Sequence, residues 1–584
     1  MGICMDAAHL MRVALGHSPP DLLLRGGRVV NVYSGEVLDG WEVAIAGDRI
    51  AAVAPPESIS AGPATTVLDV SGKVITPGFI DGHTHMDTLM LPQALIPWAL
   101  RGGTTTIITE IEVLGSAMGL PGIGWFLEAV RDQPVRFYAT APIVTYLSTD
   151  DGAGRPILSQ ADIEKLLDDP RVLGLGEVYW HRLVAEPEKV LPLIEACRRR
   201  GKWVEGHTAG ARGLKLQACV AAGINSCHEP ITPEEALERL RAGMHVMLRE
   251  GSVRRDLQAV APLRENGVNL RRAILVSDTI WPQALVARGY MDGIVQRAID
   301  LGFDPVEAIQ MATLNVAEHF GLDRDLGGIA PGRLADLLIL PDLKRIRPEG
   351  VLVGGKVVVW NGECRVSPSA PPPPKIGSPS FPRPLAPETF ALGAPGRQST
   401  ARLRAIQFKG DILTSELAVT LPVERGRVVV NPERDLLKVA AFDRRGHGRL
   451  ALGVLHGFGL KSGAVATSLC FDSGDVVVVG ASDEAMAQVA RAVVDAGGGY
   501  GVAKDDRVEL LPMPIGGVIS PLSVPEIAAR LDAIEQSIRS LGSELRNPFL
   551  AIQILTFMAI PALRITSRGL LDVKSIRTVD LFLP

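Results

Sequence analysis

Between residues 72 and 325 the chain alternates short apolar runs with longer segments of mixed polarity. The apolar runs have the length of buried strands, and the segments between them have the spacing of amphipathic helices. This alternation is typical of an α/β fold, and about 250 residues is the usual size of a TIM-type (β/α)8 barrel. The predicted barrel strands are 74–81, 104–110, 136–142, 171–177, 202–207, 223–228, 245–250 and 273–278, and the predicted helices include 187–200, 233–242 and 304–320.

On both sides of this region, which we take as a barrel domain at 72–325, the pattern changes to paired short strands. Before it, apolar runs at 22–30 and 41–50 are split by Gly and Asp turns. After it, a similar passage returns at 335–340 and 351–359. Because two sets of hairpins bracket one central region, we predict a small β-sandwich built from both flanks. Its two parts would be residues 1–71 and 326–366.

The last third of the chain is separated by a Pro-rich passage at 367–400, which includes four consecutive prolines from Pro371 to Pro374. Such a composition is typical of a linker or a surface strap. Beyond it, a strand pattern at 475–480 is followed by helical patterns at 483–496 and 524–541. We therefore predict a C-terminal α+β domain at residues 401–584.

Polar groups recur at the carboxyl ends of the predicted barrel strands. His83 and His85 end the first strand, and side chains at i and i+2 of a strand point to the same side, so that both imidazoles can bind one metal ion. In a parallel barrel these strand ends meet at one mouth. Six groups in consistent order would supply two divalent metal ions with ligands and a bridging carboxylate. The later groups are Glu177, His207, His228 and Asp278.

Composition narrows the range of partners. The formal net charge is −5 with both signs mixed along the chain, which argues against a nucleic-acid surface. No apolar run approaches the roughly 20 residues of a membrane span. The six cysteines are scattered without a CxxC pair, as expected for free thiols in a reducing compartment. We expect a cytoplasmic protein with a small-molecule substrate, no nucleic acid, no membrane, and a homo-oligomeric state on base rates.

The order of HxH on the first strand, then His, His and Asp on the fifth, sixth and eighth, resembles the amidohydrolase superfamily. A narrower set of passages is similar to the adenine deaminases, and together with Glu177 it extends the resemblance over nearly all of the chain from residue 20. These passages are 103–106, 248–252, 311–315, 326–332, 457–461 and 514–520.

The resemblance implies a binuclear metal hydrolase that deaminates adenine or a related amino-heterocycle and releases ammonia. It implies Mn²⁺ or Fe²⁺, with Zn²⁺ possible, and a metal-activated water as the nucleophile. Asp278 would act as general base and then general acid, with His228 as a second catalytic residue. One ion would be bound by His83, His85, Glu177 and Asp278, and the other by Glu177, His207 and His228.

Several loops depart from the adenine deaminase pattern and are more apolar. The segments 278–281, 110–113 and 471–474 read Asp-Thr-Ile-Trp, Glu-Ile-Glu-Val and Phe-Asp-Ser-Gly, where the family has Asp-Asp-Arg-His, Asp-Pro-His-Glu and His-Asp-Ser-His. These loops and their surroundings supply the candidate substrate-binding residues, each with a structural alternative: an internal ion pair, a helix N-terminal charge or a loop anchor. The candidates are Glu110, Glu112, Tyr179, Arg249, Glu250 and Trp281.

Two other functions stay open from the sequence. The same metal-bridging hydroxide could cleave a cyclic amide, a lactam or an N-acyl C–N bond, and the altered loops favour this option. The chain could instead be a non-catalytic binding relative that has kept the fold. That last hypothesis predicts the loss of at least one metal-ligand candidate, and all six are present.

Overall fold

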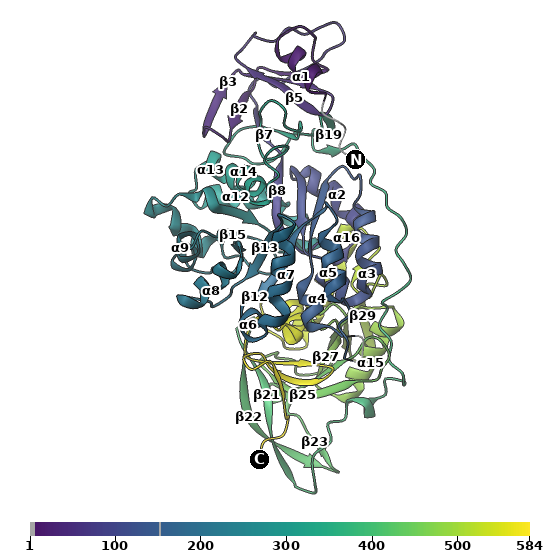
Figure 1. The fold of residues 1–584 in the computed structure, drawn as a ribbon. Helices are drawn as coiled ribbons and strands as arrows, with labels where there is room; N and C mark the ends of the chain where they lie inside the picture. The colour runs from purple at the N-terminus through teal and green to yellow at the C-terminus, as the bar shows by residue number, and fades with distance from the viewer. Residues whose placement is uncertain (1–5, 151–153, 411) are drawn as a thin grey trace.

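The computed structural model describes residues 6–150, 154–410 and 412–584. Cys4 and the first five residues of the predicted sandwich therefore lie outside the described residues. Three parts follow one another along the long axis of the molecule (Figure 1): the sandwich at one end, the barrel in the middle, and the C-terminal domain at the other end.

The central part contains eight parallel strands, as the sequence predicts. Five form a sheet of order β13-β12-β11-β10-β8, and three form a sheet of order β14-β15-β16. The two sheets meet at both edges, where Asn225 N donates to Val204 O at 2.9 Å and Asp278 N donates to His83 O at 3.0 Å. The strands are β8 (Phe79–Thr84), β10 (Thr104–Thr109), β11 (Arg136–Ala141), β12 (Val172–Tyr179), β13 (Trp203–His207), β14 (Ser226–Cys227), β15 (His245–Arg249) and β16 (Ala273–Val276).

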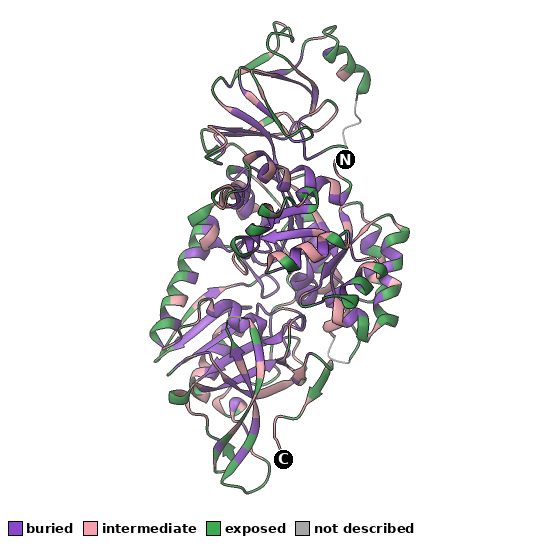
Figure 2. Cartoon of the chain, turned by 90° about the vertical axis from the view of Figure 1, so that its left-hand side faces the viewer, coloured by how far each residue is buried: buried purple, intermediate pink, exposed green. Residues whose placement is uncertain are grey.

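Helices cover the outside of these strands, and Figure 2 shows that the helices are exposed outside while the strands are buried. They are α2 (Pro92–Arg101), α3 (Glu112–Ala129), α4 (Ile143–Ser148), α5 (Gln160–Leu167), α6 (Trp180–Ala185), α7 (Pro187–Arg199), α8 (Leu214–Ala222), α9 (Pro233–Arg241), α10 (Leu257–Val260), α11 (Pro282–Arg288), α12 (Met291–Asp300) and α13 (Pro305–Met311). A last helix, α14 (Leu314–Phe320), is almost fully buried.

Two predicted elements are divided in the structure. The predicted strand 74–81 is split after Pro77. Gly78 N donates to Asp336 O and is the last step of the ladder that joins β7 (Val74–Pro77) to the sandwich, whereas Phe79 N donates to Gly103 O and begins the barrel strand. The predicted helix 304–320 is broken at Thr313, whose backbone leaves the helical region at φ −141° and ψ −88°. Its second half, α14, then packs against inward barrel side chains such as Ile80 and Ile274.

The sandwich combines both flanks of the barrel, as predicted. In its seven-stranded sheet, of order β20-β19-β18-β17-β7-β2-β3, the strand after the barrel (β17) pairs with the strand before it (β7). The second sheet has the order β5-β4-β1-β6, and α1 (Ala7–Ala14) packs on it. The strands are β1 (Leu22–Arg25), β2 (Arg28–Asn31), β3 (Glu36–Asp39), β4 (Glu42–Ala46), β5 (Arg49–Ala54), β6 (Thr66–Asp69), β17 (Leu337–Leu340), β18 (Gly350–Val353), β19 (Lys356–Trp360) and β20 (Glu363–Cys364).

The Pro-rich passage runs as an extended strap from the sandwich down the side of the barrel, on the right of Figure 1. It lies against α3, where Trp125 Nε1 donates to the carbonyl of Pro371 at 3.1 Å. A single 3₁₀ turn, Pro387–Phe390, interrupts it before the C-terminal domain begins.

The C-terminal domain is built on a nine-stranded sheet of order β23-β22-β21-β25-β24-β27-β26-β28-β29. It is tied to the barrel through a short parallel pair between β30 (Ile519–Ser520) and β9 (Leu89–Met90). Its main elements are β21 (Thr400–Lys409), β22 (Leu413–Glu424), β23 (Arg427–Val428), β24 (Leu436–Phe442), β25 (Leu450–His456), β26 (Ala464–Thr467), β27 (Val476–Gly480), β28 (Gly499–Lys504), β29 (Arg507–Pro512), α15 (Asp483–Asp495), α16 (Val524–Ser540), α17 (Pro548–Gln553), β31 (Leu563–Thr566), β32 (Gly569–Asp572) and β33 (Arg577–Val579).

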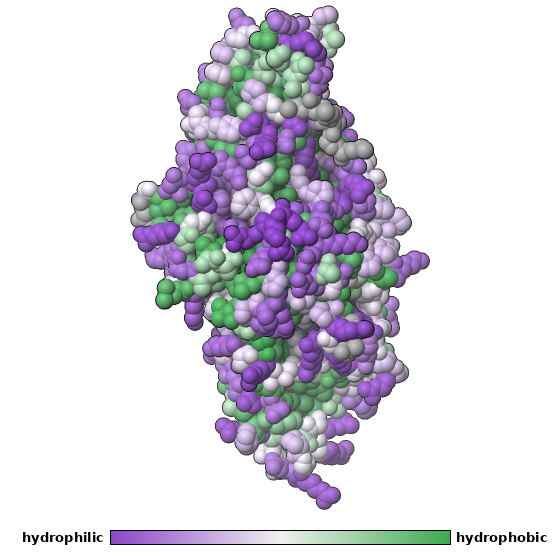
Figure 3. All heavy atoms as spheres, viewed as in Figure 1, coloured by the Kyte–Doolittle hydropathy of each residue, from purple (hydrophilic) through white to green (hydrophobic). Residues whose placement is uncertain are grey.

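The outer surface is mixed in character. Hydrophilic residues dominate the face seen in Figure 3, with smaller hydrophobic groups between them. Within the described ranges, none of the helices combines the length and the apolar character that crossing a lipid bilayer requires.

Candidate active site

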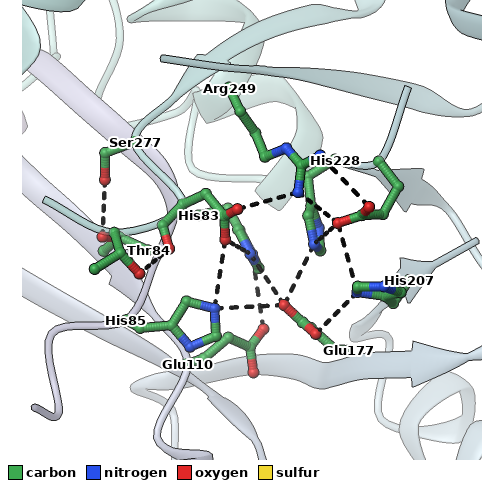
Figure 4. Close-up of polar contacts among 12 residues, drawn as sticks. His83, Thr84, His85, Glu110, Glu177, His207, His228, Arg249 and Ser277 are labelled. Atoms are coloured by element: carbon green, nitrogen blue, oxygen red, sulfur yellow. Dashed lines mark hydrogen bonds and ion pairs between the residues drawn. The ribbon is translucent and has the colours of Figure 1, made fainter. Parts of the chain in front are cut away.

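The six predicted metal-ligand residues come together at the carboxyl end of the barrel. His83 Nε2 lies 3.3 Å from Glu177 Oε1 and 3.5 Å from Asp278 Oδ1. His85 Nε2 lies 3.4 Å and 3.5 Å from the same two oxygens. These four residues are buried, and one donor atom from each falls within 4.8 Å of the others. Figure 4 shows the imidazoles of His83 and His85 and the carboxylate of Glu177 pointing toward one another.

A second group of donors shares Glu177 with the first. Glu177 Oε2 lies 3.2 Å from His207 Nδ1, and Glu177 Oε1 lies 3.4 Å from His228 Nε2. Glu177, His207 and His228 again place donor atoms within 4.8 Å of one another. The Glu177 carboxylate therefore lies between the two groups, as Figure 4 shows, where a bridging ligand would lie.

The backbone at the end of β16 fixes the Asp278 side chain. Asp278 has φ +57°, the left-handed region that few residues other than Gly, Asn and Asp adopt. Its amide donates to His83 O, and the neighbouring Ser277 N donates to Asp81 Oδ1 at 3.2 Å. Tyr290 OH donates to the other Asp81 oxygen at 2.8 Å. This buried set of hydrogen bonds holds the first and last barrel strands in register at the site.

The buried charges of the cluster determine its protonation. Burial opposes charge on His83, but the nearby carboxylates of Asp278 and Glu177 outweigh it and raise the pKa of His83 to about 10. Burial would raise the pKa of Asp278, yet His83, His85 and Arg249 hold that pKa well below its usual range. The pKa of Glu177 is lowered in the same way, against its burial, by His228 and His207. Both carboxylates are therefore ionised at neutral pH.

The donor set fits divalent metal ions. His83 Nε2, which faces Glu177 and Asp278, is buried and makes no hydrogen bond with any described residue. An unpaired buried ring nitrogen is costly unless it has a ligand to bind. Imidazole nitrogens combined with carboxylate oxygens are the ligands that Zn²⁺, Mn²⁺ and Fe²⁺ share. The site is a candidate for divalent metal binding.

Arg249 joins the cluster to a second layer of acids. Its Nη1 lies 3.2 Å from Asp278 Oδ2 and 2.5 Å from Glu229 Oε1, and its Nη2 lies 2.8 Å from Asp256 Oδ2. Glu229 is also 3.2 Å from His228 Nε2. Glu229 was not among the residues predicted from the sequence, although its place directly after His228 at a strand end was an available signal.

Glu110 and Glu112 lie behind the two histidines of the HxH motif. Glu110 Oε1 is 3.8 Å from His83 Nδ1, and Glu112 Oε1 is 3.7 Å from His85 Nδ1. Burial raises the pKa of Glu110 to about 7, and burial with the nearby Glu177 charge raises that of Glu112 well above its usual value. Carboxylates in this position commonly orient metal-binding imidazoles.

A cavity of about 680 Å³ opens from the cluster, and two of the six predicted substrate-binding residues, Glu112 and Arg249, line it. Tyr179 lies at its side, where its hydroxyl donates to Asp472 Oδ1 at 2.9 Å. Glu250 instead forms an ion pair with Arg255 at 2.5 Å, and the ring of Trp281 packs on Phe549 with centroids 5.6 Å apart. Contact of any of the six with substrate stays a prediction.

The sequence did not assign the C-terminal domain a place at the site. Asp472 of that domain accepts hydrogen bonds from Tyr179 and from Met558 N, and Phe471 and Phe557 line the cavity. The available signal was the segment 471–474, which is one of the passages that depart from the adenine deaminase pattern.

Comparison with known proteins agrees with this arrangement. The profile of the amidohydrolase family matches residues 74–358, and that of the adenine deaminase C-terminal domain matches residues 411–577. The adenine deaminase of Moorella thermoacetica is 38% identical over 581 residues, which cover 98% of this chain and 97% of the relative. The adenine deaminase of Cenarchaeum symbiosum is 37% identical over 97% of this chain and 93% of its own length.

Among solved structures, β-aspartyl dipeptidase from Fervidobacterium islandicum AW-1 aligns over 60% of this chain and 98% of its own, with 17% identity and a TM-score of 0.48. The full-length relatives and the two matched profiles decide the family. This chain belongs to the amidohydrolases and, within them, to the adenine deaminase family.

Proposed function

We propose that this protein hydrolyses adenine or a closely related amino-heterocycle to the corresponding oxo compound and ammonia. The observation that carries the proposal is the pair of donor groups that share Glu177, the first of which includes Asp278, at the cavity that opens from them. Full-length similarity to adenine deaminases supports the class of substrate.

Two divalent ions, Mn²⁺ or Fe²⁺ with Zn²⁺ possible, are part of the proposal. His83, His85, Glu177 and Asp278 would hold one ion, and Glu177, His207 and His228 would hold the other. When bound, such ions lower the pKa of a water molecule and polarise the substrate. Glu229 Oε1 lies 3.2 Å from the same Nε2 of His228 that faces Glu177, so it adds a further carboxylate beside this donor group.

Asp278 is suited to moving the proton. Because its pKa is held well below the usual range, it is ionised at neutral pH and can accept a proton from the attacking water. Arg249, 3.2 Å from Oδ2, orients the carboxylate. Water then adds to the ring carbon that bears the amino group, the C–N bond breaks, and Asp278 returns the proton to the leaving ammonia. His228 is the second candidate catalytic residue: burial and the charge of His83 lower its pKa, so its imidazole is neutral at pH 7.

The decisive experiment is an ammonia-release and ultraviolet-absorbance assay with adenine, on protein reconstituted with Mn²⁺. Conversion to hypoxanthine with one ammonia per base is the expected result. Bound metal without any turnover of adenine or of a related amino-heterocycle would contradict the proposal. We further propose that the enzyme works as a homo-oligomer in the cytoplasm, which gel filtration and fractionation would test.

A second candidate is hydrolysis of a cyclic amide, a lactam or an N-acyl C–N bond by the same residues. The apolar lining of the outer cavity, which includes Phe471, Leu550 and Phe557, favours it. A panel of such compounds, assayed for ring opening or acyl release, separates this candidate from deamination because no ammonia is formed from a lactam.

A further inference from the structure

The cavity has two halves of different character. The barrel supplies most of its charged lining, including Glu112, Glu177, Arg249 and Asp278. The C-terminal domain supplies ten apolar residues, which we call the apolar wall. The apolar wall consists of Ile412, Leu413, Phe471, Leu550, Ile554, Phe557, Ala559, Ile560, Pro561 and Val573.

The apolar wall begins directly at the cluster of metal-ligand candidates. The ring of Phe557 lies edge-on to that of His207, with centroids 5.8 Å apart, and 6.0 Å from that of Tyr179. Phe471 continues the surface, 5.6 Å from Phe557. A molecule whose reacting carbon lies at the cluster therefore has this surface within reach of its remaining atoms.

Hydrogen bonds hold the wall in place. Asp472 Oδ2 accepts from Met558 N at 2.6 Å, while Asp472 Oδ1 accepts from Tyr179 of the barrel. Thr556 Oγ1 donates to the carbonyl of Phe471 at 2.6 Å. The segment that carries Phe557 is thus fixed to both Asp472 and Phe471, as a binding surface requires.

The size of the cavity adds a second argument. Its 680 Å³ falls in the range of roughly 300–1,000 Å³ that is usual for drug-sized ligands. An unsubstituted purine base is much smaller, and most of its edge consists of ring nitrogens and the amino group. Such a base would occupy the inner, polar half and would leave the apolar wall in contact with water, which is unfavourable.

We propose that the preferred substrate is an amino-heterocycle that carries an alkyl or aryl substituent, and that the apolar wall binds this substituent. This inference rests on the proposed function, since the reaction is the same: water adds, the C–NH₂ bond breaks, ammonia leaves, and the substituent is untouched. The lining also contains the cationic side chains of Lys215, Arg254 and Lys574, so a phosphate-bearing substrate is the competing class that the polar controls below test.

The first test compares kcat/KM for adenine with that for adenines substituted by butyl or benzyl groups at each ring position other than the amino-bearing carbon. Hydroxyethyl-substituted and ribose phosphate-substituted adenines are the polar controls. We expect at least one butyl or benzyl compound to exceed adenine at least tenfold, mainly through KM, without a gain for its polar counterpart. If adenine remains the best substrate, or the phosphate compound exceeds all others, the inference is overturned and the proposed function stands. If no compound releases ammonia from metal-loaded protein, the proposed function itself fails.

The second test alters the apolar wall. Ile560→Asn places a polar group on the wall at a partly exposed position, and we expect the preference for the substituted compound over adenine to fall tenfold or more. Leu191→Ala, on the exposed side of α7, is the control and should leave the preference unchanged. Thermal unfolding of each variant reports on folding, and an unchanged preference in folded Ile560→Asn contradicts the inference.

Discussion

The two halves of the cavity are stabilised by opposite means. On the barrel side, charges are buried and balanced against one another, as in the contacts of Arg249 with Glu229, Asp256 and Asp278. On the C-terminal side, Leu550 and Ile554 are 2% and 1% exposed and continue the hydrophobic core. Buried charge requires complete pairing, whereas an apolar surface tolerates changes of shape and volume.

This difference teaches where variation can occur in such an enzyme. Removing one charged group of the barrel half leaves its partners buried and unpaired, so that the chemistry is lost at once. Changing one side chain of the apolar wall alters the shape of the space and hence the choice of substrate. On the proposal made above, reaction type and substrate preference are carried by different domains, and the following predictions test that separation.

The largest effect is expected for Glu177→Gln, because Glu177 belongs to both donor groups. The variant should lose most of its bound metal, and turnover should fall by at least about 10³-fold. Atomic absorption and ammonia release measure the two quantities. Glu416→Gln, at an exposed ion pair with Arg404, is the matched control. A Glu177→Gln protein that keeps two metal ions would show that the barrel half does not depend on this carboxylate.

Asp278→Asn separates proton transfer from metal binding. An amide cannot accept the proton, so kcat should fall about 10²- to 10⁴-fold. Because His83, His85 and Glu177 remain, much of the metal should stay bound. Rates and metal content measured on the same preparation provide the test, and a variant with most of its activity would exclude Asp278 as the base.

Tyr179→Phe tests the contact between the two halves. It removes the hydroxyl that donates to Asp472 Oδ1 at 2.9 Å and leaves that buried oxygen unpaired. The free energy of unfolding should fall by about 1–3 kcal/mol, and kcat/KM should fall less than in either barrel variant. Urea unfolding and steady-state kinetics measure the effects. Tyr33→Phe, at a residue 42% exposed, is the control. Equal losses of stability and of kcat/KM in both variants would show that the hydrogen bond to Asp472 contributes nothing measurable.

The sequence allowed the barrel half to be predicted because its signals are local. An apolar strand followed by a polar group, as at His83 and Glu177, places that group at the mouth through the geometry of the strand alone. The division at Pro77 was missed because one apolar run serves two sheets, and only the change of partner from Asp336 at Gly78 to Gly103 at Phe79 separates them.

The position of the apolar wall at the active site could not be predicted from the sequence, and the reason is physical. Phe471 and Phe557 lie about 290 residues or more after Glu177 in the chain, and no periodic pattern states which face of one domain covers another. Their place at the site depends on docking, through β30 with β9 and through Asp472 with Tyr179. The segment 471–474 differed from related sequences, which marked it as unusual but did not indicate which residues of the barrel it contacts.

The smallest effect is expected for His245→Gln, which removes a polar side chain of the barrel outside the cluster of metal-ligand candidates. His245 Nδ1 lies 3.0 Å from His319 Nδ1, and burial with the nearby His319 charge lowers the pKa of His245 to about 2 from 6.5. As the pH falls below 6.5, His245 binds a proton in the unfolded chain but stays neutral in the folded protein, so the free energy of unfolding falls. By pH 5 the resulting loss in the free energy of unfolding is at most about 2 kcal/mol, and above pH 7.5 there is no such loss.

In His245→Gln, urea unfolding should show a smaller loss in the free energy of unfolding between pH 7.5 and 5 than the parent shows. His17→Gln, at an exposed position, controls for removing a histidine. If His245→Gln and the parent lost the same free energy of unfolding between pH 7.5 and 5, the buried His245 would not contribute to the pH dependence of stability.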